Sequence, residues 1–243
     1  MSLFKYRPVD KNSLNILIND ELYFATSSQF NDPFDSQLSP SEYIQSLELL
    51  GIYDSTSELL VHEKSLQERF ERKGIYCLSS YDDNLLMWSH YGDSHKGICF
   101  GFRDDLHSHV RADGPVSSEE VDYLKDGEHV YTTLYTDLNS GSRFDDKDGF
   151  VNWCNKQQAL FKTAFTKKHK NWEYEQEVRL LCDDNGVMKF NPSALESVTF
   201  GMRISEQDKE TVLTLLTLEK WSHVKVYQAK AKELELALDI ELC

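Results

Sequence analysis

Apolar and aromatic residues form short runs along the chain, and between several of these runs apolar residues recur at helical spacing. Residues 3–6, 21–26, 74–80 and 97–102 are runs of this kind, and their composition is typical of strands. Further runs predict strands at residues 119–124, 128–135, 174–181, 187–190, 197–202, 223–229 and 232–242. In the last of these, the alternation predicts that Leu234, Leu236, Leu238 and Ile240 share one face.

Helical spacing is clearest after Asp10, where Leu14, Leu17 and Ile18 follow a residue suited to capping a helix. The same spacing predicts two helices between residues 41 and 72, and one helix each over 149–168 and 205–221. A DDNG turn between 174–181 and 187–190 predicts a hairpin.

Strands and helices alternate without a regular strand–helix–strand repeat, which favours the α+β class. We expect a mixed, mainly antiparallel sheet flanked by helices, in a single domain over residues 1–243.

Charge and cysteine content reduce the number of functional classes that fit the chain. The net charge of -15 and pI of about 4.9 disfavour general nucleic-acid binding, because such a surface repels a phosphate backbone. The five cysteines are widely spaced and contain no CxxC, which favours free thiols in a reducing cytoplasm. Neither a leader segment nor an apolar stretch of about 20 residues is evident, so we expect a cytoplasmic protein without a membrane span.

Four charged residues alternate in NWEYEQEVRLL. In a strand, Glu173, Glu175, Glu177 and Arg179 would share one face. Partial burial of such a carboxylate row would raise at least one pKa, which suits acid/base work or stabilisation of a positive transition state. Arg179 is a further candidate ligand-binding residue. The alternative is a solvated face neutralised at its end by Arg179.

In the stretch NLLMWSHYGDSHKGICFGF, several large side chains that end in a polar group directly precede an apolar strand. Trp88, His90, Tyr91, His95 and Lys96 are candidate ligand-binding residues in a loop held by rigid elements. We expect this segment to line a cleft facing Glu175–Glu177. The alternative is that Trp88 is core and that both histidines bind loops by hydrogen bonds. The histidine and cysteine spacing matches no zinc pattern, so no metal is expected.

Two shorter motifs add candidates. Asn31 and Asp32 precede Pro33 in a segment that suits either ligand contact or a simple turn. Lys5, Tyr6 and Arg7 lie on the first strand, where Arg7 can hold a phosphate or carboxylate, including an internal one. The chain has no GxxxxGK[ST], GxGxxG, GxSxG or HExxH motif, which argues against the commonest nucleotide-binding, hydrolase and zinc-protease families.

The order of LFKYRP, ELYFATSSQFNDPFDS, IYCLSSYDDNLLMWSHYGDSHKGICFGF and WEYEQEVRLL resembles a bacterial family known as domain of unknown function 2971. The resemblance extends over nearly the whole chain, and MWSHYGDSHKGICFGF is its most specific block. The family label implies no reaction.

A more distant resemblance is to ADP-ribosyltransferases, which carry a His or Arg on a first strand, a Ser or Tyr on a middle strand and a late Glu-x-Glu. This resemblance implies NAD as the substrate, Glu177 as the catalytic carboxylate, Glu175 as the acceptor-orienting group and Ser79 as a brace. It also implies that Lys5 or Arg7 contacts ribose or phosphate, and that Tyr6, Trp88 or Tyr91 stacks on nicotinamide.

Three functions remain open at this stage. The first is ADP-ribosyl transfer or NAD hydrolysis in a bacterial toxin or phage-defence system, which predicts that Arg7, Ser79 and Glu177 converge in a cleft. The second is a non-catalytic domain that senses a small-molecule ligand or binds a protein partner. The third is a metal-dependent nuclease using Asp32, Asp35 and Glu177, which the acidic charge balance disfavours.

Overall fold

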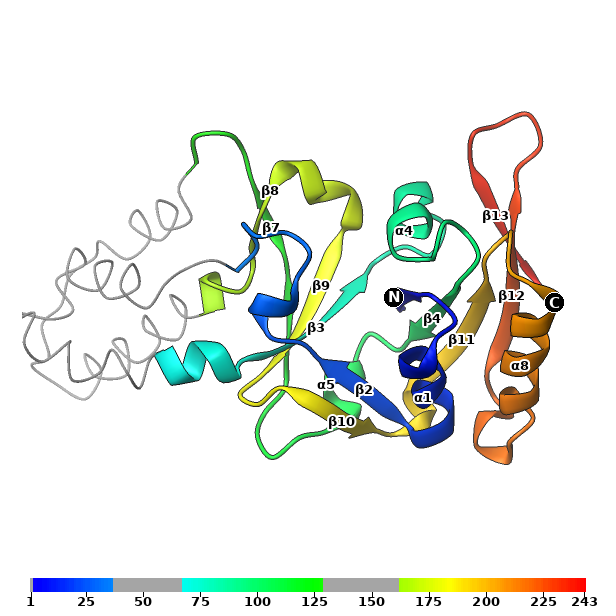
Figure 1. Ribbon diagram of the computed structural model, residues 1–243, viewed down its shortest axis with the longest axis horizontal. Coiled ribbons are helices and arrows are strands. Elements are labelled where there is room, and N and C mark those ends of the chain that lie inside the picture. Colours follow the sequence, from blue (N-terminus) through cyan, green and yellow to red (C-terminus); the bar gives the residue numbers. More distant parts are fainter. Residues whose placement is uncertain (1, 37–66, 129–161) are drawn as a thin grey trace, which may run out of the picture. The chain divides into compact units, whose positions relative to one another are not determined.

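The computed structural model describes residues 2–36, 67–128 and 162–243 (Figure 1). Contacts divide the chain into two units. One comprises Met1–Ala25, Gly74–Glu120 and Glu173–Cys243, and the other comprises Thr26–Lys73 and Val121–Trp172. The single domain expected from the sequence stays a prediction. None of the described helices is long and apolar enough to cross a membrane.

The first unit is built on an eight-stranded, mostly antiparallel sheet, in which only β11 and β12 pair in parallel. Its order is β13-β12-β11-β4-β1-β3-β9-β6. The strands are β1 (Leu3–Arg7), β3 (Gly74–Ser79), β4 (Ile98–Phe102), β6 (Ser117–Glu120), β9 (Glu177–Cys182), β11 (Leu195–Phe200), β12 (Lys225–Ala231) and β13 (Leu238–Leu242). This sheet and its flanking helices confirm the α+β class.

A smaller sheet of order β2-β10-β5 buries its apolar side chains in the same hydrophobic core as the large sheet. It consists of β2 (Glu21–Phe24), β10 (Gly186–Phe190) and β5 (Val110–Arg111). The predicted hairpin between residues 174–181 and 187–190 is therefore wrong, because β10 pairs with β2 and β5 while β9 pairs with β3 and β6. Strands β9 and β10 both bury apolar side chains in this core, so the chain crosses from one sheet to the other at the turn.

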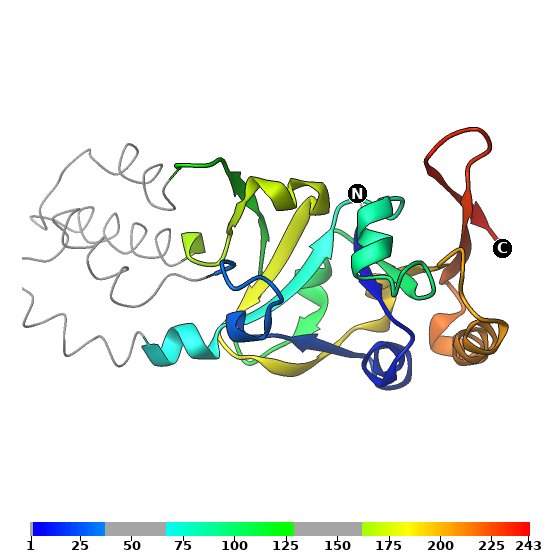
Figure 2. The same cartoon turned by 45° about the horizontal axis from the view of Figure 1, so that its top comes forward.

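Helices cover both faces of the large sheet. Helix α1 (Lys11–Asn19) and helix α8 (Glu206–Leu216) bury apolar residues in the larger core, whereas helix α4 (Leu85–His90) packs in a second cluster. Figure 2 shows the teal α4 on one side of the strands and the blue α1 and orange α8 on the other. The capping prediction for Asp10 is confirmed: its carboxylate accepts the Ser13 amide at 2.8 Å.

Short helical turns complete the first unit. These are α5 (Leu106–His109) and the 3₁₀ turns η2 (Lys170–Glu175), η3 (Pro192–Ala194) and η4 (Glu219–Trp221). The first three residues of η2 are assigned to the second unit. The final strand is shorter than predicted. Leu234 and Leu236 lie in the turn before β13 and are exposed, so only Leu238 and Ile240 of the expected row lie on the strand and pack in the second cluster.

In the second unit, β7 (Asp122–Leu124) pairs in parallel with β8 (Lys167–His169), and η1 (Ser27–Gln29) follows a capping box on Thr26. The run 119–124 therefore divides between β6 and β7. The helix predicted over 149–168 is wrong at its end, because residues 167 and 168 belong to β8, whose backbone pairs with β7. The predictions over 41–66, 129–135 and 149–161 lie outside the described residues.

Candidate functional site

The predicted row of carboxylates is broken by a turn. Lys170–Glu175 forms a 3₁₀ turn, and Gln176 adopts a left-handed backbone conformation with φ of 42°. Both the amide and the side chain of Gln176 donate to the Glu173 carbonyl, which closes this turn before β9 begins at Glu177. Of the four charged residues, only Glu177 and Arg179 share a strand face.

One face of the β6–β9–β3 part of the sheet is polar. The register places Ser79 opposite Glu177, and both Cys77 and Glu119 opposite Arg179. The alternate residues of β3 and β9 point the other way, into the apolar core. Sequence alternation in GIYCLSS predicts that Cys77 shares a face with Ser79, but neither Cys77 nor Glu119 was recognised from the sequence as a member of this site.

Glu177 and Arg179 form a bidentate ion pair within this polar face. The Arg179 Nε donates to Glu177 Oε1 at 2.8 Å, and a terminal nitrogen donates to Oε2 at 3.0 Å. Arg179 is 0% exposed and Glu177 is 5% exposed, so both charges are held away from water. Burial, followed by the Glu177 carboxylate, raises the pKa of the Cys77 thiol, which therefore stays protonated at neutral pH.

Glu175 is buried beside this pair and is held from two directions. Its side chain accepts a hydrogen bond from the Tyr91 hydroxyl at 2.6 Å, and its carbonyl accepts one from the Ser79 hydroxyl at 2.7 Å. The Asn84 amide donates to the Tyr174 carbonyl at 2.6 Å. The segment after Asn84 therefore lies against residues 174–175. The exposed His90 ring is tilted against the Tyr174 ring, with the two ring centroids 6.1 Å apart.

Trp88 and Tyr6 are both buried among protein side chains, as in the alternative that places Trp88 in the core. Trp88 is 0% exposed, packs edge-on against Tyr6 at 5.1 Å and donates from Nε1 to the Asp82 carbonyl at 2.7 Å. Tyr6 is also buried, and its hydroxyl donates to the Tyr81 carbonyl. Helix α4 buries Met87 and Trp88 and leaves Leu85 and Leu86 exposed.

Lys5 and Arg7 lie on the opposite face of the sheet from Ser79, because the register pairs Phe4 with Ser79. Arg7, Ser79 and Glu177 therefore do not share one sheet face. The Lys5 ammonium donates to the Cys77 carbonyl at 2.7 Å, and loss of solvation there lowers its pKa. Arg7 lies 3.6 Å from the Asp10 carboxylate, an internal partner of the kind considered from the sequence.

The GDSHKG loop after α4 has an unusual backbone. Asp93, Ser94 and His95 adopt positive φ angles of 49°, 54° and 67° in succession. Three such non-glycine residues in a row persist only where the surroundings enforce them. The His95 carbonyl accepts a hydrogen bond from the Arg203 amide at 2.8 Å. The His95 ring stacks on Trp88 and lies within hydrogen-bond distance of the Ser89 hydroxyl. Desolvation, followed by Arg203, lowers the pKa of His95; Lys96 beside it is exposed.

A substitution at Gly97 tests how tightly this loop is held. A Cβ atom at Gly97 would overlap the Arg7 carbonyl oxygen, so Gly97→Ala is expected to reduce the free energy of unfolding by about 1–3 kcal/mol. Urea denaturation measures this change. Gly114→Ala is the matched control, because its Cβ atom would meet nothing within 4 Å. Equal stability of the two variants would contradict a tightly packed loop.

Asn31 and Asp32 lie in the second unit. Asp32 accepts the Phe34 amide at 2.9 Å, which is the turn geometry that its sequence context favours. Asp35 is buried and lies 3.4 Å from the Lys168 ammonium. Within the described residues, no group of three or more His, Cys, Asp or Glu side chains could hold a metal ion.

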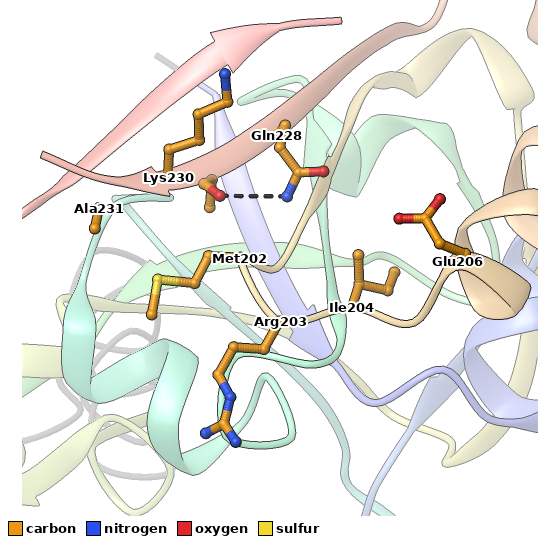
Figure 3. A pocket seen from close by; sticks show the side chains of 8 residues that line it. Met202, Arg203, Ile204, Glu206, Gln228, Lys230 and Ala231 are labelled. Carbon is orange, nitrogen blue, oxygen red and sulfur yellow. Dashed lines mark hydrogen bonds between the residues drawn. The ribbon is translucent and has the colours of Figure 1, made fainter.

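An open pocket lies elsewhere in the first unit, at the carboxyl ends of the parallel strands β11 and β12 (Figure 3). It is lined by Met202, Arg203, Ile204, Glu206, Gln228, Ala229, Lys230 and Ala231. The Gln228 side chain is fixed there by the Gly201 carbonyl and the Lys209 ammonium. This pocket was not predicted from the sequence, although a strand–helix–strand order over residues 197–229 was the available signal.

Comparisons with known proteins give one match. Residues 87–180 match the sequence model of a family described as a protein of unknown function, DUF2971. No curated protein matches the chain, and no solved structure does either. These comparisons therefore lend no support to the resemblance to ADP-ribosyltransferases. Residues 87–180 are therefore similar to this family, whose description names no function.

Proposed function

We propose that the polar face of β3 and β9 cleaves the nicotinamide–ribose bond of NAD, as an NAD hydrolase or an ADP-ribosyltransferase. The observation that carries this proposal is the direct pairing of Ser79 with Glu177 on neighbouring strands, with β1 as the next strand of the sheet. These are the three strands that the distant resemblance singles out. The Ser79 hydroxyl also braces the turn that presents Glu177, by binding the Glu175 carbonyl.

The reaction needs negative charge near the ribose. When the nicotinamide–ribose bond breaks, nicotinamide leaves with the bonding electrons and C1′ becomes oxocarbenium-like. The Glu177 carboxylate stabilises this positive charge, and its pairing with Arg179 favours the ionised form. Water, or an acceptor nucleophile, then adds at C1′ and releases a proton. Glu175, fixed by Tyr91, orients that nucleophile.

The departures from the resemblance change the assigned roles. Lys5 and Arg7 lie on the other sheet face, so they do not act with Ser79 and Glu177 in this proposal. Trp88 and Tyr6 are core residues, so the aromatic contacts of nicotinamide fall in this proposal to Tyr91, which binds Glu175, and to His90, which lies beside Tyr174. No metal takes part, and a role in toxicity or phage defence would follow from consumption of cellular NAD.

Nicotinamide release from NAD by the purified protein tests the proposal. Glu177→Gln is expected to lower the rate by about 100-fold or more, whereas the exposed Glu173→Gln should leave it unchanged. The double variant Glu177→Gln/Arg179→Gln removes both buried charges and guards against loss of folding. Full turnover by a folded double variant, or no NAD binding by the wild type at millimolar concentration, would overturn the proposal.

A second function is favoured by a specific observation: Glu177 is already held by two hydrogen bonds from Arg179. Such a pair is also a fitting structural element in a domain that recognises a ligand or protein without chemistry. NAD binding without nicotinamide release, and unaffected by Glu177→Gln, would favour this alternative.

A further inference from the structure

Exposed apolar side chains gather on the hairpin formed by β12 and β13. Five large apolar side chains of the described residues are at least 61% exposed, and three of them belong to this hairpin. They are Leu234 at 105%, Leu236 at 98% and Leu242 at 67%. Figure 1 shows the red tip of the hairpin extending past the neighbouring strand ends. Leucines this exposed within one short segment mark a contact surface more often than scattered ones do.

The outer side of β13 is a free strand edge. Strand β13 is the last in the sheet order, so no described strand pairs with its outer side. The Cys243 amide donates to Val226, and the Lys232 amide donates to Ala237, which fixes which residues bond inward. Because the pattern alternates along an antiparallel strand, the N–H and C=O groups of Leu238, Ile240 and Leu242 point outward.

The two faces of β13 differ in chemistry. Leu238, Ile240 and Leu242 lie on one face, and the exposed Asp239 and Glu241 lie on the other. Lys230 binds Glu241 at 2.6 Å and is the cation that faces this pair from β12. A strand added to this edge therefore meets an apolar row on one face and a net acidic row on the other.

A second copy of the chain fits this edge poorly. Antiparallel pairing of two β13 strands with a continuous apolar face would bring the acidic rows of both copies together on the other face. Like charges placed opposite each other across strands destabilise the pairing. The complementary occupant is an extended segment whose side chains alternate between apolar and basic.

We propose that β13 is a docking edge for such a segment of another protein, which adds a ninth strand to the eight-stranded sheet. Backbone hydrogen bonds to Leu238, Ile240 and Leu242 supply the attachment. The apolar row and the two carboxylates select the sequence. This proposal is independent of the chemistry assigned to Glu177.

Two synthetic peptides of about eight residues, a common strand length, test the proposal. One alternates valine with lysine and the other alternates valine with glutamate, both with blocked ends. The lysine peptide is expected to bind at least about 10-fold more tightly, because its charges complement the acidic row. Binding is also expected to slow hydrogen exchange at the outward amides of Ile240 and Leu242, but not at the inward amides of Asp239 and Glu241.

Variants separate edge pairing from general attraction to an acidic protein. Leu242→Pro removes one outward N–H on an edge strand, where proline is tolerated, and should weaken binding by at least about 10-fold. Leu242→Ala keeps that N–H and should weaken binding less. Equal binding of both peptides, or equal binding of the lysine peptide to wild type and Leu242→Pro, would overturn the proposal. So would sedimentation showing that the wild type forms dimers and that Leu242→Pro does not.

Discussion

Replacing Arg179 by methionine is expected to reduce the free energy of unfolding by about 3–5 kcal/mol, because it leaves the Glu177 carboxylate buried without its bidentate partner. The loss comes mainly from desolvation, since a buried charge that has lost its counter-ion is far less stable than one exposed to water. Denaturation in urea, followed by circular dichroism, measures the change.

The control for this prediction is the double variant Glu177→Leu/Arg179→Met, which removes both charges. It is expected to recover most of the lost stability, because an apolar pair of similar size needs no compensation for lost hydration. A single variant less than about 1 kcal/mol below wild type would mean that water or another group compensates the carboxylate.

The second large effect is expected at Trp88. Trp88→Ala should reduce the free energy of unfolding by about 3–5 kcal/mol, because the ring is fully buried against Tyr6 and its Nε1 binds the Asp82 carbonyl. The same urea titration measures the loss. Leu86→Ala on the same helix is the matched control, since Leu86 is exposed and should change stability by no more than about 0.5 kcal/mol.

Trp88→Ala also distinguishes two interpretations of the segment after Asn84. If Trp88 stacked on a ligand, the variant would keep its stability and lose binding. The buried position of Trp88 instead predicts that the variant loses stability, whether or not a ligand binds. A stable Trp88→Ala protein would contradict the buried packing of helix α4.

Local patterns predicted much of the fold. The helix after Asp10, the strands around residues 74–80 and 97–102, and the α+β class follow from alternation, helical spacing and capping. The pairing of β10 with β2 did not follow, because register between distant strands depends on which faces share a core. A turn signal such as DDNG marks a reversal but does not fix the sheet to which the next strand belongs.

The candidate site was predicted in part. Ser79 lies opposite Glu177 in the sheet register, and Ser79 and the half-buried Tyr91 both bind Glu175 by hydrogen bonds. The functional roles of these residues stay predictions. The alternation through Glu173 failed because Gln176 takes a left-handed conformation, which periodicity does not detect. The expectation that Lys5 or Arg7 lies with Ser79 and Glu177 failed for another reason. The sequence of one strand does not show which of its two faces lies on the same side of the sheet as the polar face of a neighbouring strand.

The order of strands in the large sheet has a consequence for synthesis of the chain. Strand β3 pairs along its whole length with β9, so Gly74 meets Cys182, and β4 pairs with β11. Contacts so distant along the chain make folding slow, since long loops must close before any of these pairs forms. A ribosome-bound chain that has not yet exposed β9 would therefore leave β3 without this neighbour. The nascent protein would then depend on chaperones that shield an unpaired apolar strand.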